Sequence, residues 1–165
     1  EKKINFNISK DQNFIEFSPL AFQYLKIISK QIRSGPGGLL ILDYGYIKNA
    51  MKNTIQAISK HQKTDVLKTF GDADITYQIN FKLIKKIANT LKLKCSKIIT
   101  QSEFLTNLGI QKRAEILSKN LPFSKKANIY YRMKRLIDKN QMGKLFKVIF
   151  ITNNKIMFKE GFKAD

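Results

Sequence analysis

Cysteine and histidine are the scarcest reactive residues of this chain. Its 165 residues include one cysteine, Cys95, and one histidine, His61. A single cysteine excludes an internal disulfide and a cysteine-based zinc site, and one histidine adds too few ligands for a His/Cys metal centre. We therefore expect no metal site. Cys95 lies in an apolar stretch with Leu93 and Ile98, which favours a buried structural thiol.

Long apolar runs are absent as well. No run of about 18 apolar residues occurs, which excludes a membrane-spanning helix, and no secretory signal pattern stands at the start. The first residue is Glu1 rather than a methionine, so we expect a processed, cut or split product. A length of 165 residues with 43% hydrophobic residues predicts one domain with its own core.

Acidic residues are few: 12 stand against 31 lysines and arginines, for a formal net charge of +19. Such a balance raises the possibility of a nucleic-acid or acidic-lipid partner. The cations, however, are mostly lysines spread along the chain beside abundant isoleucine and asparagine, the set that A/T-rich codons encode. Base reading and bidentate phosphate contacts favour arginine, so we do not expect nucleic acid to be the partner. The arginines are Arg33, Arg113, Arg132 and Arg135.

The segment GPGGLLILDYGY, residues 35–46, combines glycines with an apolar run. A phosphate-binding loop has its glycines after a strand and before a helix, whereas here they follow a helical pattern and precede a strand. A helix stop with a tight turn is the better interpretation. Asp43-Tyr44-Gly45 at the carboxyl end of the strand are the better candidates for a ligand site, because ligands of open α/β sheets bind at that edge.

Hydrophobic periodicity predicts alternating strands and helices. The expected strands cover residues 2–8, 38–43, 93–100 and 145–152, with a hairpin turn at Asn153-Asn154 and a returning strand over 155–158. The expected helices run from Ser18-Pro19 to about Gln31, over 81–92, in pieces from Ser102 to about Lys119, and over 125–138. Residues 49–80 look like loop with a little strand.

The strand 38–43 does not alternate between polar and apolar residues. Such a strand needs cover on both faces, as in the middle of a parallel sheet. The other expected strands are too few to provide it, so we expect residues outside this chain to supply part of the sheet. The apolar strand should otherwise leave an exposed edge that favours aggregation or a homodimer.

Several segments, in a fixed order, resemble one enzyme family. They are EFSPLA, GGLLILDYGY, NTIQAISKHQKTDVL, FGDADITYQINF, TQSEFLTNLGIQKR and RLIDKNQMGKLFKV. Together they cover about Glu16 to Thr152 and resemble the C-terminal part of the MidA-type methyltransferases, which depend on S-adenosyl-L-methionine (SAM). The mitochondrial members of that family are complex I assembly factors with protein-arginine methyltransferase activity.

The resemblance implies the C-terminal part of a Rossmann-like seven-stranded α/β methyltransferase fold. Residues 1–165 would form a partial domain with sheet strands five to seven and an insertion over 46–80. The N-terminal SAM-binding strands would be missing, and no G-x-G-x-G occurs in the sequence. We thus expect no cofactor-binding residue in this chain and SAM only in the complete enzyme. The implied partners are the missing half and a protein substrate, such as a complex I subunit.

Three residues are candidates for catalysis. An arginine acceptor needs carboxylates and other hydrogen-bond acceptors around its guanidinium, and Asp43 is the best placed carboxylate, although it could instead cap the following turn. Tyr44 could line the acceptor pocket or serve as a core aromatic. His61 falls on the histidine of the family pattern, although a single histidine is more often structural or exposed.

Four further residues are candidates for substrate binding. Asp72 and Asp74 form an acidic i, i+2 pair that would face one side of an extended segment; alternatively, they belong to a solvated loop. Thr76 could brace Asp74. Gln101 follows a strand and could orient the substrate or cap the next helix.

The residues leave other functions open. The chain could be a catalytically inactive fragment, or an assembly or scaffold protein that works by contact alone. A basic nucleic-acid-binding module is a further alternative, and would show steeply salt-dependent binding. The expected location is the cytoplasm of a bacterium with A/T-rich coding, or the mitochondrial matrix if the source is eukaryotic.

Overall fold

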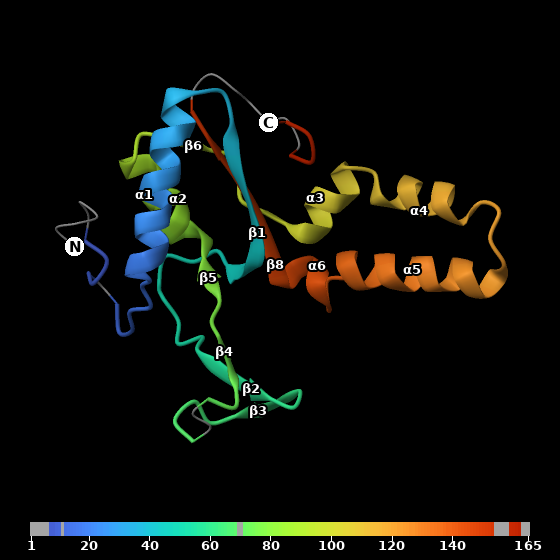
Figure 1. Cartoon of the computed structure of the whole chain (residues 1–165), viewed down its shortest axis with the longest axis horizontal. Helices are drawn as coiled ribbons and strands as arrows, with labels where there is room; N and C mark the ends of the chain where they lie inside the picture. The colour runs from blue at the N-terminus through green and yellow to red at the C-terminus, as the bar shows by residue number, and fades with distance from the viewer. Residues whose placement is uncertain (1–6, 11, 69–70, 154–158, 163–165) are drawn as a thin grey trace.

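The structure, a computed structural model, describes residues 7–10, 12–68, 71–153 and 159–162. A sheet covered by helices forms the body, and a pair of helices extends from it to one side (Figure 1). In chain order the elements are α1 (Pro19–Ser34), β1 (Gly38–Tyr46), β2 (Gln56–Ser59), β3 (Gln62–Thr64), β4 (Asp74–Thr76), β5 (Ile79–Asn80), α2 (Phe81–Thr90), β6 (Lys94–Cys95), β7 (Ile99–Thr100), α3 (Gln101–Asn107), α4 (Ile110–Ser118), α5 (Phe123–Ile137), α6 (Met142–Leu145) and β8 (Phe146–Thr152).

The central sheet has the strand order β5-β1-β8-β6, and β7 also pairs with β8. Strands β1 and β8 are antiparallel over seven residue pairs, from Gly38 opposite Thr152 to Tyr44 opposite Phe146. On its other side β1 pairs in parallel with β5 only at Gly45 and Tyr46. Among the described residues, the edge of β1 from residue 38 to 44 therefore carries no neighbouring strand.

One face of this sheet is well covered. Helices α1 and α2 pack on it, and its core includes Phe81, Ile149 and Ile151, each at most 1% exposed. On the opposite face α3 and Phe162 cover Val148, but Leu40 and Leu42 of β1 stay 43% and 40% exposed. The exposed edge and apolar patch expected of β1 in this chain alone are therefore both present, and their cover by residues outside this chain stays a prediction.

Side-chain caps mark the start of α1, α2 and α3. The Ser18 hydroxyl accepts a hydrogen bond from the Ala21 N–H at 3.1 Å, and Pro19 opens α1. Asn80 caps α2 in the same way, and Thr100 with Glu103 forms a capping box on α3. The expected helices are thus confirmed, with ends that shift by a few residues.

Glycine at position 45 has a packing reason. A β-carbon there would collide with the Ile79 carbonyl oxygen of β5. The absence of a side chain lets β5 approach β1 closely enough to pair, and this pairing carries the chain directly into α2.

Residues 49–80 hold more structure than the sequence indicates. Strands β3, β2 and β4 form a separate three-stranded antiparallel sheet, which extends below the body in Figure 1. Its strands are only three or four residues long, too short to show a clear period of two. The expected strand over 93–100 is likewise split into β6 and β7.

Two expectations fall on residues that the structure does not describe. The returning strand over 155–158 and its turn residue 154 lie outside the described ranges. So does most of the expected strand 2–8, and its described residues, 7 and 8, are not in a strand. Within the described residues, no helix combines the length and apolar character that crossing a membrane requires.

Candidate functional site

Glu16 ties three distant segments together beside the carboxyl end of β1. Its carboxylate accepts hydrogen bonds from the Thr54 N–H at 2.7 Å, the Thr54 hydroxyl at 2.7 Å and the Ile55 N–H at 3.1 Å. The Thr54 hydroxyl oxygen in turn accepts the Gln78 N–H at 2.9 Å. The segment before α1, the loop after β1 and the linker before β5 are thereby fixed to one another.

A cluster of amide and hydroxyl groups surrounds Tyr44 at the same place. The Tyr44 hydroxyl oxygen accepts hydrogen bonds from the side-chain amides of Gln56 and Gln78, both at 3.3 Å. The Gln56 amide also donates to the Thr76 hydroxyl at 3.2 Å. With both acceptor positions of Tyr44 occupied by these amides, the amide oxygens of the two glutamines are left to accept hydrogen bonds from a ligand.

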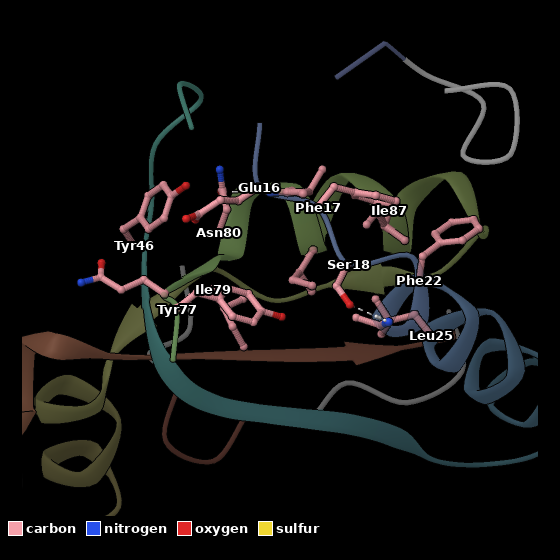
Figure 2. Close-up of a pocket in the computed structure, with 14 residues that line it drawn as sticks. Glu16, Phe17, Ser18, Phe22, Leu25, Tyr46, Tyr77, Ile79, Asn80 and Ile87 are labelled. Carbon is pink, nitrogen blue, oxygen red and sulfur yellow. Dashed lines mark hydrogen bonds between the residues drawn. The ribbon is translucent and has the colours of Figure 1, made fainter. Parts of the chain in front are cut away.

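A mainly apolar pocket adjoins this cluster between α1, α2 and β5. Tyr46 and Tyr77 lie at one end of it and Phe22 and Leu25 at the other (Figure 2). It offers about 70 Å³ to the centres of water molecules, which is room for a few waters or one docked side chain. Gln78 belongs to both the pocket and the Tyr44 cluster. The pocket therefore opens towards polar groups at one end.

Asp43 and Tyr44 point to opposite sides of the sheet, as consecutive strand residues do. The Tyr44 ring contacts Phe146, with ring centres 6.1 Å apart. The exposed Asp43 carboxylate accepts the Tyr44 N–H at 2.7 Å, a bond to the next residue within β1 and not a cap of the following turn. Asp43 remains open to solvent and to a ligand on its own face.

Lys147 stands opposite Asp43 in the β1–β8 ladder. Burial, with a smaller contribution from the Lys144 cation, lowers the pKa of Lys147 below its usual value, and Glu103 acts in the opposite direction. Its ammonium donates to the carbonyl oxygens of Lys144 and Leu145. The positive charge nearest to Asp43 in the ladder is therefore directed towards backbone carbonyls.

His61 lies at the tip of the β2–β3 hairpin. Lys60 and His61 have φ values of 49° and 64°, the left-handed pair that a two-residue hairpin turn requires. β2 separates this tip from Gln56 by roughly 10 Å, at about 3.3 Å per residue. The chain alone does not bring the exposed His61 to Asp43 or to the Tyr44 cluster, and its catalytic role stays a prediction.

The acidic pair is arranged differently from the expected extended segment. Asp74 begins β4, but Asp72 lies in the turn before it, so the two do not share one strand face. Both carboxylates are exposed. The hydroxyl of Thr76 accepts from Gln56, which places Thr76 in the Tyr44 cluster.

Gln101 is remote from this cluster in its contacts. It is 3% exposed, and its amide donates to the Leu136 carbonyl oxygen at 2.8 Å. Thr100, not Gln101, caps α3. Gln101 thus connects α3 to the end of α5, and a contact with substrate stays a prediction.

The sequence did not single out Glu16, Thr54, Gln56 or Gln78 as site residues. Glu16, Thr54 and Gln56 do occur inside the segments EFSPLA and NTIQAI, so the resemblance contained a signal for them. Their partners lie 12 to 39 residues away along the chain, a distance that no local pattern reveals. Among the described residues, no group of three or more His, Cys, Asp or Glu side chains could hold a metal ion.

Among the described residues, the pocket beside β1 does not have the size or polarity of a SAM site. The pocket beside β1 is too small for a nucleoside cofactor and mostly apolar, Glu16 is engaged by Thr54, and the sequence has no G-x-G-x-G. That the groups holding the cofactor lie outside this chain stays a prediction.

Comparisons with known proteins agree with this geometry. A family model described as "Putative S-adenosyl-L-methionine-dependent methyltransferase" matches residues 2–99. The chain is 30% identical over 148 residues to the mitochondrial protein arginine methyltransferase NDUFAF7 of Danio rerio, a match that covers 88% of this chain and 35% of the relative. The Drosophila melanogaster homologue, also mitochondrial by name, is 31% identical over 125 residues, with 74% and 28% covered. The chain thus spans about a third of the length of these curated relatives.

Two solved structures from Burkholderia thailandensis share the fold. An uncharacterized protein matches with a TM-score of 0.77 at 20% identity, over 93% of this chain and 43% of that chain. A "likely methyl transferase" bound to S-adenosyl-homocysteine matches with a TM-score of 0.76 at 20% identity, over 94% and 42%. They confirm the expected fold class, the C-terminal part of a methyltransferase α/β fold. On the family match and the identity to curated relatives, the chain belongs to the family of S-adenosyl-L-methionine-dependent methyltransferases.

Proposed function

We propose that this chain is the C-terminal part of a methyltransferase that transfers a methyl group from SAM to arginine side chains of a protein. The names of the relatives support this substrate class: each is a protein arginine methyltransferase. Those relatives are also mitochondrial by name, which supports the mitochondrial matrix as the location and a respiratory complex I subunit as the acceptor.

The proposed domain organisation follows from the sheet. Residues 1–165 form one partial domain in which β1 is the fifth strand and β6, β7 and β8 provide the sixth and seventh, with residues 46–80 as an insertion. The unpaired edge of β1 and the exposed Leu40 and Leu42 support this arrangement, because a strand and a helix from the N-terminal part would cover both.

The observation that carries the proposal is the Tyr44 cluster at the carboxyl end of β1. A guanidinium donates hydrogen bonds and accepts none, so its site must offer oxygen acceptors. Tyr44 holds the amides of Gln56 and Gln78 by their nitrogens, which leaves their oxygens for the acceptor arginine. Asp72 and Asp74 would provide negative charge around it, and His61 would shape the pocket in the complete enzyme. Asp43 lies on the opposite face of β1, so it would have to reach the guanidinium across the carboxyl end of the strand.

The test is methyl incorporation into candidate complex I subunits by the chain reassembled with its N-terminal half. Asp43→Asn keeps the shape and removes the charge. A charge-assisted hydrogen bond contributes about 1.5–3 kcal/mol, so kcat/KM should fall about ten- to hundredfold. Tyr44→Phe should release both glutamines and lower kcat/KM by about tenfold, while SAM affinity stays unchanged in both variants.

The outcomes separate the alternatives. Equal rates for wild type and Asp43→Asn remove Asp43 from the site. Methylation of nucleic acid or small molecules alone overturns the arginine assignment. No methylation by a reassembled enzyme that binds SAM points to an assembly role by contact alone. Calorimetry on the isolated chain should show weak SAM binding or none, and low-micromolar binding would reveal a cofactor site within residues 1–165.

A further inference from the structure

The helices α4 and α5 form an antiparallel hairpin, residues 110–137, here named the α4–α5 arm. Figure 1 shows the arm extending away from the sheet. α4 packs against α5 and α3, and the base of α5 packs against α3 and α6. Small residues of α4, Ala114 and Ser118, fill the contact between the helices, and α5 has no buried residue. The outward faces of the arm are therefore open.

The arm concentrates positive charge. It holds eight basic residues and one acidic residue, Glu115. Three of the four arginines of the chain lie in it: Arg113, Arg132 and Arg135. The Lys112–Glu115 pair, at 3.0 Å, is the one ion pair that the structure shows among these arm residues, all of which it describes. The remaining cations thus face solvent without a neutralising carboxylate.

The same arm exposes large apolar side chains. Phe123 at the start of α5 is 86% exposed, Tyr131 70%, and Ile116 and Leu117 of α4 58% and 48%. Protein interfaces are enriched in tyrosine and arginine. The exposed aromatic and aliphatic side chains of the arm, next to its arginines, resemble such an interface in composition.

A shallow groove along α5 combines both features. Leu121 and Ile129 contribute to its lining, together with Ser124 and Asn128, and Lys125 and Arg132 also line it. Lys125 and Arg132 lie seven residues apart, nearly two helical turns, which corresponds to about 10 Å along the axis. Two carboxylates at a similar spacing, with an apolar side chain between them, would match this groove.

From these observations we infer that the α4–α5 arm is a docking surface for an acidic segment of a partner protein that carries apolar side chains among its carboxylates. Charge complementarity selects the acidic partner. The exposed Ile116 and Leu117 favour a protein over a nucleic acid, because aliphatic side chains offer nothing to phosphates and little to bases. A second copy of this chain is disfavoured, because two arms of the same positive charge repel.

This inference does not depend on methyl transfer. It concerns residues 110–137, which lie beyond the family match at residues 2–99, and it would hold for an inactive assembly protein as well. Loss of arm binding with normal methylation of short peptides, or the reverse, therefore distinguishes its failure from that of the proposed function.

The experiment uses the full 165-residue chain and an array of 15-residue peptides in which the numbers of Glu and of Leu or Phe vary independently. The best peptide is then labelled and titrated in 150 mM salt, a concentration that screens long-range attraction beyond about 8 Å. Its version with Gln for Glu and a 20-nucleotide poly(U) RNA serve as comparison ligands. We expect binding that needs both carboxylates and apolar residues.

Two variants locate the binding. The charge reversal Lys125→Glu/Arg132→Glu/Lys134→Glu should weaken the peptide at least tenfold. The matched reversal Lys26→Glu/Lys30→Glu/Arg33→Glu on exposed positions of α1 changes the net charge equally and should weaken it less than threefold. Phe123→Ala/Tyr131→Ala, two exposed positions that do not support the fold, should weaken it at least fivefold.

Three results would overturn the docking role. Equal losses for both charge reversals would mean that net charge alone attracts the peptide. No binding to any acidic apolar peptide would show that the arm does not dock acidic segments. Tighter binding of poly(U) than of every peptide would assign the arm to nucleic acid instead.

Discussion

The body and the α4–α5 arm of this chain differ in how much apolar surface they bury. In the body, β8 and α2 bury Phe81, Val148 and Ile149 completely, and long-range hydrogen bonds fix the loops around Glu16. In the arm, several large apolar residues are exposed, and Lys112 is the one cation with an ion-pair partner among these residues. We therefore expect the body to contribute most of the free energy of folding and the arm to contribute mainly an exposed surface. Four paired comparisons between the two regions test that contrast.

The largest difference should come from two phenylalanines. Phe81, the first residue of α2, is fully buried beside Gly45 of β1. Phe123 is 86% exposed on the arm. Phe81→Ala leaves a cavity and should lower the free energy of unfolding by about 3–5 kcal/mol. Phe123→Ala should change it by less than about 0.5 kcal/mol. Chemical denaturation measures both, and similar losses would contradict the contrast.

Thiol reactivity offers a second comparison. Burial raises the pKa of the Cys95 thiol to about 11, and the Lys85 cation opposes this shift only in part. At pH 8.5 the alkylation of Cys95 should be roughly 50-fold slower than that of an arm thiol, Tyr131→Cys in a Cys95→Ser background, because the thiolate reacts. Equal rates would show that Cys95 is not shielded.

The same raised pKa has a consequence for stability. The unfolded chain regains an ordinary thiol pKa near 9.0, so above that pH it loses its proton before the folded chain does. The contribution of Cys95 is thus complete below pH 9 and is lost as the pH rises towards 11. Cys95→Ser should remove this part of the pH dependence of unfolding.

Two glutamates form the third pair. Glu16→Gln removes an acceptor that holds Thr54 and Ile55, and should lower the free energy of unfolding by about 2 kcal/mol. Glu115→Gln breaks an exposed ion pair on the arm and should cost less than about 0.5 kcal/mol. Thermal unfolding resolves the difference, since 1 kcal/mol shifts Tm by about 2–4 °C in a chain of this size.

The smallest difference in stability between the body and the arm should come from their exposed apolar residues. Leu40→Thr/Leu42→Thr should change unfolding by less than about 1 kcal/mol but reduce self-association, because it removes an apolar patch beside the unpaired edge of β1. Ile116→Gln/Leu117→Gln on the arm should leave self-association unchanged. Sedimentation measures the self-association of both variants. A monomeric wild type would contradict the assumption that the exposed edge of β1 causes self-association.

Local signals predicted most elements because their causes are local. Ser18 and Pro19 start α1 as predicted, by a hydrogen bond that spans three residues. The start of α3 was predicted at Ser102, and its capping box uses Thr100 with Glu103 instead. The sheet β3-β2-β4 was missed because its strands are too short to show a period. The exposed edge of β1 was predicted from the sequence, because an apolar strand needs neighbours on both sides and this chain has too few other strands to provide them.

The sequence by itself determined the family, the helices and the central strands, since those depend on residue order and short-range periodicity. Only the tertiary structure decided which side chains meet. It separated Asp43 from Tyr44 by the alternation of a strand, placed His61 on a hairpin tip, and joined Glu16 to Thr54 across 38 residues. Such contacts depend on how distant segments pack against one another, and the free energy of that packing depends on all of those segments together.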